Sequence, residues 1–399
     1  MSARSEQNIL LRGQGIDPNT FVRERQSYTQ FQTWIADTRG MVGCPLNCKY
    51  CFLQLDGKTP IRPHEDIPLE QMISELKNVE TYHPNMPVNF GSETDVFSTR
   101  HNINYYYDLL RRYGETDFPN TIIFISKCSI PDKILDVATE IKQPVLFYIS
   151  YSGLGGTKIE PNVRVNDIRD NFVRLKARNL PVIHYWRPFL PQNSNKETFD
   201  EILDHVTKYA TCSVINGLRL NDGIRANIAK FWPELIEQDY DFSKTGEFWP
   251  QGVRGFLAKY LQQKHPDYPA FFGNTPCSVA YAQEKNDIQG LYNGRMCRES
   301  QCPETQRGKC AQNYHRPTEK ELRRAIDEMG IKPSVTIFDK DMIVIKEKVE
   351  AGKLAYLRTA LGFPVVSKTI TYQAGYNWAK VREDEGIIEV SWKGNWITI

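Results

Sequence analysis

Three cysteines stand close together in the stretch GCPLNCKYCFLQ, residues 43–54, with the spacing C-x3-C-x2-C. Cys44, Cys48 and Cys51 lie within eight residues, close enough for their thiolates to bind three corners of one iron–sulfur cubane. A structural zinc site or an all-cysteine cluster needs a fourth ligand at similar range, and no further cysteine is near in the sequence. His64 is the alternative fourth ligand and would make the loop a zinc site. Without it, the three thiolates are an incomplete ligand set for most metal sites.

A second cysteine group falls in residues 274–317, a segment with little hydrophobic periodicity to fold it. We expect such a segment to need a metal or a partner to hold its shape. Four thiolates suit a structural zinc ion or a fully ligated second [4Fe-4S] cluster, and unligated thiols are the third alternative. The four cysteines, spaced x19, x4 and x7, are Cys277, Cys297, Cys302 and Cys310.

The composition is that of an ordinary globular protein. The chain has 399 residues, of which 40% are hydrophobic and 25% charged, so we expect one large domain with a smaller appendage. A net charge of +2 neither demands nor excludes an anionic partner. No apolar run is long enough to span a membrane and the N-terminus lacks a signal-peptide pattern, so we expect a cytoplasmic protein. In a reducing compartment, clustered cysteines are typical metal ligands.

Apolar strand-like runs alternate with amphipathic helical runs from about residue 33 to 220, which predicts an α/β fold with a parallel sheet. Six βα units would form a partial (β/α)6 TIM-like barrel, with functional loops at the carboxyl ends of the strands. We expect an N-terminal extension (1–30), the barrel (31–225), a cysteine-rich metal region (226–317) and a small C-terminal α+β domain (318–399). The predicted strands are 33–42, 87–91, 121–126, 145–150, 181–187 and 213–220; the predicted helices lie near 66–76, 103–112, 131–141, 165–178 and 197–209.

With Tyr50 before its last cysteine, the first cysteine group resembles the signature of radical S-adenosylmethionine (radical SAM) enzymes. The resemblance implies a [4Fe-4S] cluster on Cys44, Cys48 and Cys51, with the amino and carboxylate groups of S-adenosyl-L-methionine (SAM) on the open iron. It also implies reductive cleavage of SAM to a 5′-deoxyadenosyl radical that abstracts hydrogen from a substrate. A reducing partner such as flavodoxin or ferredoxin would supply the electron.

The segment Gly91-Ser92-Glu93-Thr94-Asp95 follows the second predicted strand. It resembles a variant of the Gly-Gly-Glu segment that meets the SAM ammonium and ribose in this superfamily. Glycine allows close approach of the backbone, and a carboxylate suits a cation. The alternative is an ordinary helix N-cap cluster of Ser, Thr and Asp.

Polar residues at later strand ends are similar to those of the spore photoproduct lyase-like branch. Ser126 and Lys127 end the third predicted strand and Ser150 the fourth, where the resemblance implies contacts with the SAM carboxylate and ribose. In residues 160–195 a Glu-Pro pair precedes a helix, and Arg187 ends the fifth predicted strand beside the expected cluster. The resemblance covers roughly residues 30–220. One departure is that no cysteine ends the second strand, where the lyase has its hydrogen donor, which argues against repair of thymine dimers by that route.

Basic and aromatic side chains are interleaved near the second cysteine group and the C-terminus, a composition that suits phosphates and unstacked bases. A nucleic-acid base or nucleotide is therefore the predicted substrate. A radical SAM enzyme that modifies a peptide and a non-catalytic, metal-stabilised nucleic-acid-binding protein are the alternatives. Two isolated cysteines, Cys128 and Cys212, are predicted near the ends of the third and sixth strands. The basic and aromatic residues are Arg295, Arg298, Arg307, Lys309, Arg316, Tyr372, Tyr376, Trp378, Lys380, Arg382, Trp392, Lys393 and Trp396.

Overall fold

The computed structural model describes residues 26–31, 33–220, 222–237, 248–273, 275–287, 301–333, 336–338 and 342–367, and the strand backbones 379–384, 387–392 and 395–398. Across these ranges, every helix is too short or too polar to cross a membrane.

An eight-stranded sheet forms the centre of the fold, in the order β1-β2-β5-β6-β7-β8-β9-β10. Every neighbouring pair from β2 to β10 is parallel, and β1 is antiparallel to β2. This arrangement confirms the predicted α/β class with consecutive βα units, and it adds a strand at each edge. The strands are β1 (Tyr28–Gln30), β2 (Ile35–Asp37), β5 (Val88–Phe90), β6 (Ile122–Ser126), β7 (Val145–Ser150), β8 (Val182–Trp186), β9 (Cys212–Ile215) and β10 (Ala270–Phe272).

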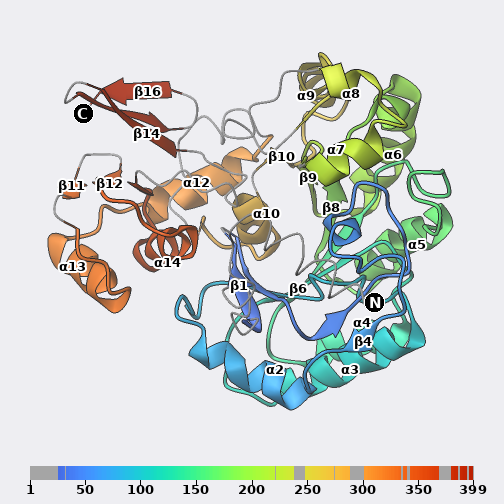
Figure 1. The fold of residues 1–399 in the computed structure, drawn as a ribbon, viewed down its shortest axis with the longest axis horizontal. Coiled ribbons are helices and arrows are strands. Elements are labelled where there is room, and N and C mark those ends of the chain that lie inside the picture. The colour runs from blue at the N-terminus through green and yellow to red at the C-terminus, as the bar shows by residue number, and fades with distance from the viewer. Residues whose placement is uncertain are drawn as a thin grey trace, which may run out of the picture.

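Amphipathic helices cover one face of this sheet and follow one another around its outside (Figure 1). In α3, for example, Tyr106, Leu109 and Tyr113 are fully buried, and the Tyr113 ring packs edge-on against Phe90 of β5. Thr99 caps this helix by accepting a hydrogen bond from the Asn102 N–H. The helices are α2 (Leu69–Glu75), α3 (Arg100–Gly114), α4 (Asp132–Glu140), α5 (Val165–Ala177) and α6 (Lys196–Tyr209).

Helix α10 (Thr275–Ala282) packs against the other face of the sheet, near the middle of the molecule (Figure 1). The alternate residues of the strands, which point away from α2 to α6, meet it there. Leu146 and Tyr148 of β7 and Ile183 of β8 belong to this second core, and the Tyr148 hydroxyl lies 3.0 Å from Ser278 Oγ. The sheet is therefore buried on both faces, which explains its nearly continuous apolar strands.

Two of the predicted strands were too long. The predicted strand 33–42 is broken after Asp37, and Met41–Val42 (β3) pairs instead with β4 (His64–Glu65) in a separate ribbon. The break arises because the Asp37 carboxylate accepts hydrogen bonds from the loop after β5, which holds the chain in a turn. The predicted strand 213–220 ends at Ile215, since Leu218 pairs with Phe248 in an isolated bridge.

Asp66 lies just before α2 but does not cap it. Its carboxylate lies 3.0 Å from Arg39 Nε, and Pro68 is the N-cap residue without a side-chain hydrogen bond. The Leu69 N–H donates instead to Glu65 Oε1 at 3.0 Å. A carboxylate therefore still accepts a hydrogen bond from the first turn of α2, but this carboxylate belongs to Glu65 and not to Asp66.

Smaller elements complete the fold after β9. Lys353 of α14 forms an ion pair of 2.6 Å with Glu80, and the Tyr356 ring packs edge-on against His83, so α14 is docked on the sheet domain. Helix α13 begins with a capping box between Thr318 and Glu321. The elements are α7 (Asp222–Ile228), α8 (Glu234–Glu237), α9 (Val253–Lys264), α12 (Glu304–Asn313), α13 (Glu319–Glu328), β11 (Thr336–Phe338), β12 (Ile343–Ile345), α14 (Ala351–Leu361), β13 (Val365–Ser367), β14 (Ala379–Asp384), β15 (Ile387–Trp392) and β16 (Asn395–Thr398).

Candidate active site

The first cysteine loop lies over the carboxyl ends of the parallel strands and is held there from two sides. On one side the Gly43 N–H donates to the Glu93 carbonyl at 2.9 Å, and Thr94 Oγ1 donates to the Gly43 carbonyl at 2.5 Å. On the other side the Lys49 N–H donates to the Ile159 carbonyl at 3.0 Å. The loops after β5 and β7 therefore fix the position of the loop before any ligand binds.

The three thiols of this loop are free of disulfide bonds and largely removed from water. Burial raises the pKa of Cys44 to about 12 and also raises the pKa values of Cys48 and Cys51. At Cys51 the positive charges of Arg187 and Lys127 act against burial and favour the thiolate. Buried thiolates need nearby positive charge, and an iron–sulfur core bound to all three would supply it.

A single zinc ion fits this loop less well than a cluster does. Among the residues that the structure describes, no three His, Cys, Asp or Glu side chains form a group arranged to hold one metal ion. His64, the alternative fourth ligand, is exposed on β4. Three thiolates that bind separate irons of a cluster do not have to meet at one point, so the donor set fits a cluster with an open iron.

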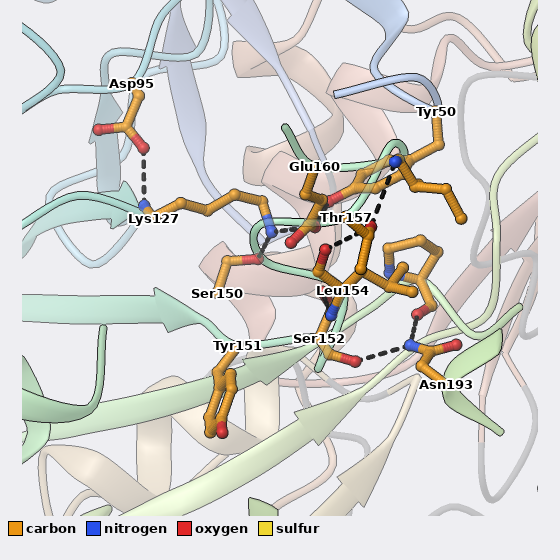
Figure 2. Close-up of polar contacts among 12 residues, drawn as sticks. Tyr50, Asp95, Lys127, Ser150, Tyr151, Ser152, Leu154, Thr157, Glu160 and Asn193 are labelled. Carbon is orange, nitrogen blue, oxygen red and sulfur yellow. Dashed lines mark hydrogen bonds and ion pairs between the residues drawn. The ribbon is translucent and has the colours of Figure 1, made fainter. Parts of the chain in front are cut away.

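A buried network of polar side chains joins the cysteine loop to the strand ends, as Figure 2 shows. Lys127 Nζ donates to Ser150 Oγ at 2.8 Å and to Glu160 Oε1 at 2.9 Å. The Tyr50 hydroxyl donates to the same oxygen of Glu160, and the Lys127 ammonium lies 5.7 Å from the centre of the Tyr50 ring. The structure thus brings together three predicted site residues, Tyr50, Lys127 and Ser150. They surround the carboxylate of Glu160, which was not predicted as a site residue.

Glu160 was not predicted as a site residue from the sequence, although the Glu-Pro pair to which this residue belongs was identified. The side chain is 1% exposed, and Oε2 is buried without a hydrogen-bond partner in the part of the chain that the structure describes. A buried carboxylate oxygen without a donor is costly, which is typical of a site that expects a ligand or water. A carboxylate directly before a proline at the end of a βα loop was the available signal.

Asp95 is a second buried carboxylate and organises the end of β6. It accepts a hydrogen bond from Ser126 Oγ at 2.8 Å. It accepts another from the Lys127 N–H at 2.6 Å (Figure 2). Burial raises the pKa of Asp95, while these hydrogen bonds act in the opposite direction. Ser126 is therefore engaged with Asp95, and its effect on a ligand would come through the position of Lys127.

The glycine that opens the segment 91–95 is required by its backbone. Gly91 has φ +87°, and a Cβ at this position would lie 2.1 Å from Val96 Cγ1. The Gly91 and Ser92 N–H groups donate to Asp37 Oδ1 at 2.8 and 2.9 Å. Burial raises the pKa of Asp37 to about 7, against the effect of these two hydrogen bonds. The alternative role as a helix cap is wrong, because Thr99 caps α3.

The Glu93 carboxylate, the predicted partner of the SAM ammonium, is paired within the protein. Lys58 Nζ lies 2.5 Å from Glu93 Oε2, and both side chains are 13% exposed. Lys58 belongs to the chain that follows the cysteine motif, so this ion pair is a third link between the two segments. A ligand cation at Glu93 would have to share the carboxylate with Lys58.

Arg187 directly follows β8, as predicted. Its guanidinium stacks over the Tyr185 ring at 4.7 Å from the ring centre, and Nη1 donates to the Tyr185 hydroxyl at 2.8 Å. Its charge reaches Cys51, whose pKa it acts to lower. These contacts place a fixed cation next to the cysteine loop.

A pocket opens beside the cysteine loop, between the end of β6 and the starts of α4 and α5. Its wall combines apolar groups with charged ones, and Arg164 and Asp167 form an ion pair of 3.4 Å at its rim. Asn162 Nδ2 donates to the Pro45 carbonyl at 2.9 Å and ties the rim to the loop. Cys128, two residues beyond β6, faces this pocket. The lining residues are Pro45, Leu46, Phe97, Ser98, Ile103, Lys127, Cys128, Ser129, Pro131, Asn162, Arg164 and Asp167.

Other predicted residues lie elsewhere. Cys212 is the first residue of β9 and therefore sits at the amino end of that strand. Cys277, Cys302 and Cys310 lie on the α10 side of the sheet. Outside the described residues are Cys297, Arg295, Arg298, Tyr372, Tyr376, Trp378 and Lys393, and the side chains of Lys380, Arg382, Trp392 and Trp396.

No protein-family model and no curated protein matches this chain. Among solved structures, it is similar to spore photoproduct lyase complexed with a dinucleoside spore photoproduct, with a TM-score of 0.48 and 16% identity over 63% of this chain and 80% of that one. A double mutant of that lyase with bound AdoMet and the same photoproduct gives a TM-score of 0.46 and 15% identity over the same shares. SuiB of Streptococcus suis bound to S-adenosylmethionine gives 0.44 and 13%, over 73% of this chain and 65% of that one.

Proposed function

We propose that this protein is a radical SAM enzyme whose [4Fe-4S] cluster is held by Cys44, Cys48 and Cys51. The main support is the position of three cysteines on one loop, two of them buried, next to the network of Tyr50, Lys127 and Glu160. When bound, the cluster and SAM supply reductive cleavage of SAM to a 5′-deoxyadenosyl radical that abstracts hydrogen from a substrate.

The residues around the loop would bind and orient SAM. Lys127 and Ser150 offer a cation and a hydroxyl, which suit a carboxylate and a ribose. The free oxygen of Glu160 suits an ammonium or hydroxyl donor. Arg187 adds positive charge at the loop. In this proposal Gly91, Ser92, Glu93 and Thr94 form the facing wall, and Ser126 acts by holding Asp95 and, through it, Lys127.

A nucleic-acid base or nucleotide is the substrate class that we propose for the pocket beside the loop. Phe97, Ile103 and Leu46 offer apolar contacts for the flat face of a base, while Arg164 and Lys127 suit a phosphate. A flavodoxin or ferredoxin would provide the electron.

Anaerobic reconstitution with iron and sulfide tests this proposal. We expect a brown protein that binds about four irons at the first cysteine group and forms 5′-deoxyadenosine from SAM under dithionite. Oligonucleotides should stimulate this reaction more than peptides do, and their effect should weaken with salt. The matched control is the Cys44→Ala, Cys48→Ala, Cys51→Ala triple variant.

Two results would overturn the proposal at different levels. If the triple variant keeps all of the iron and the SAM cleavage of the unaltered chain, the proposed site is wrong. If SAM is cleaved but only peptides stimulate the reaction, the enzyme class stands and the nucleic-acid substrate is wrong. A protein that binds nucleic acid without cleaving SAM would be the non-catalytic alternative.

A further inference from the structure

Three thiols of the second cysteine group meet at one pocket, although they are far apart in the sequence. Cys277 comes from α10, Cys302 precedes α12, and Cys310 lies on α12; the intervals are 302 − 277 = 25 and 310 − 302 = 8 residues. Cys277 and Cys310 are each 9% exposed, and all three are free of disulfide bonds. Asp287 lines the same pocket. Four potential metal ligands therefore face a single pocket.

Nitrogen donors surround the sulfur of Cys310. The Asp287 N–H donates to Cys310 Sγ at 3.3 Å, and Gln306 Nε2 lies 3.4 Å from the same atom. Gln306 is itself held by a hydrogen bond of 2.6 Å to the Lys285 carbonyl. A neutral thiol is a weak acceptor, whereas metal-bound thiolates regularly accept N–H hydrogen bonds from the surrounding shell. The shell around Cys310 is that of a ligand sulfur.

This pocket lies toward the amino ends of the strands, opposite the first cysteine loop. The Gln301 N–H, next to Cys302, donates to the carbonyl of Ala270, the first residue of β10. Gln283, at the end of α10, donates to Thr121 directly before β6. A strand of six residues such as β7 spans about 20 Å, so the sheet separates the two groups.

We propose that Cys277, Cys302 and Cys310, with Asp287, form a structural metal centre for a thiophilic metal, either Zn²⁺ or an iron–sulfur cluster. The centre joins α10 to α12 and closes the α10 face of the sheet. Because no group in the described residues is already arranged around one ion, metal loading requires either rotation of these side chains or a cluster that they bind at separate irons. Its position away from the strand carboxyl ends assigns it to stability and not to substrate chemistry.

Metal counts on the full-length, anaerobically purified protein test this centre without any activity assay. The unaltered chain is compared with the Cys302→Ala, Cys310→Ala double variant, the Cys44→Ala, Cys48→Ala, Cys51→Ala triple variant and a Cys212→Ala control. Cys212 is a buried thiol of the same core that does not line the pocket. We expect the double variant to lose one zinc, or one cluster of iron, that the triple variant and the control retain.

Equal zinc and iron in the double variant and the unaltered chain would overturn the centre, whatever happens to the first site. If the double variant does not fold, X-ray absorption at the zinc and iron edges is measured on the triple variant instead. The triple variant lacks the first cysteine group, so any metal that it binds should come from the second centre. Sulfur neighbours at about 2.3 Å would support it. A triple variant that folds without bound metal would refute it.

Discussion

The two cysteine groups occupy opposite ends of one parallel sheet, and their surroundings differ. The first lies among charges, where Lys127, Glu160 and Arg187 are fixed within reach of its thiols. The second lies against the apolar α10 face, where the neighbours of Cys310 are neutral amide donors. Charges that are buried and fixed suit a charged ligand, whereas amide donors around sulfur suit a metal with a complete ligand set. The same residue type therefore has different predicted roles at the two ends.

Loss of the first cysteine group should have the largest effect. In the Cys44→Ala, Cys48→Ala, Cys51→Ala variant we expect formation of 5′-deoxyadenosine to fall by about 1000-fold or more, because the proposed cluster loses all three of its thiolate ligands. Chromatographic measurement of 5′-deoxyadenosine under dithionite checks this. The Cys302→Ala, Cys310→Ala variant should stay within about threefold of the unaltered protein if it folds. Equal losses in both variants would contradict the division of roles.

Glu160→Gln should weaken both the fold and the ligand site. The substitution leaves the Lys127 ammonium, whose side chain is 12% exposed, without its carboxylate partner. Since breaking a buried pair is strongly destabilising, we expect a loss of about 3 kcal/mol in the free energy of unfolding. We also expect SAM to bind about tenfold more weakly, as measured by equilibrium dialysis on the reconstituted protein.

The matched control for this variant is Glu197→Gln, at an exposed position on α6. It should change neither quantity beyond the error of the measurement. If Glu160→Gln behaves like this control, the network around Lys127 does not support the site.

Asp37 should give the region of the first cysteine group a pH-dependent stability. Its pKa is about 7 in the folded protein and 3.8 as its ordinary value, so between these values the folded state holds a proton that the unfolded state has lost. The contribution of Asp37 to stability therefore falls as the pH rises through this window, by about 1.4 kcal/mol per pH unit at its steepest, and is constant above it.

Asp37→Asn keeps an acceptor for the Gly91 and Ser92 N–H groups and removes the titration. Urea unfolding at pH 4.5, 5.5, 6.5 and 7.5 should show a smaller fall in stability with pH for this variant than for the unaltered chain. Parallel curves for the two proteins would refute the assignment.

A contact remote from both cysteine groups gives the smallest expected effect. Lys353 pairs with Glu80, whose side chain is 66% exposed, where α14 docks on the sheet domain. Lys353→Ala should lower the free energy of unfolding by less than about 1 kcal/mol, because exposed ion pairs contribute little. Thermal unfolding checks this, and a larger loss would mean that α14 docking depends on this ion pair.

Sequence patterns predicted the serial strands well, because strands such as β6 and β7 are unbroken apolar runs between turn signals. They missed β1 and β10, which have three residues each and gain their partners only from the completed sheet. The break after Asp37 was also hidden, since it depends on N–H groups some 54 residues away along the chain.

The candidate site could be predicted only in part, because some of its contacts join residues that are far apart in the sequence. Cysteine spacing and strand ends nominated Lys127, Ser150 and Tyr50, and these three do share one network. The engagement of Glu93 with Lys58 and the burial of Glu160 depend on how separate loops fold over one another. The residues that neighbour Glu93 and Glu160 in the sequence do not indicate these long-range contacts.

The backbone hydrogen bonds that hold the cysteine loop on both sides, at Gly43 and at Lys49, bear on how the proposed cluster could be replaced after exposure to air. Because these hydrogen bonds join backbone groups and use no thiol, oxidative loss of the proposed cluster would leave them in place. The emptied protein should then accept a replacement cluster without refolding, so that repair would be limited by the delivery of iron and sulfide.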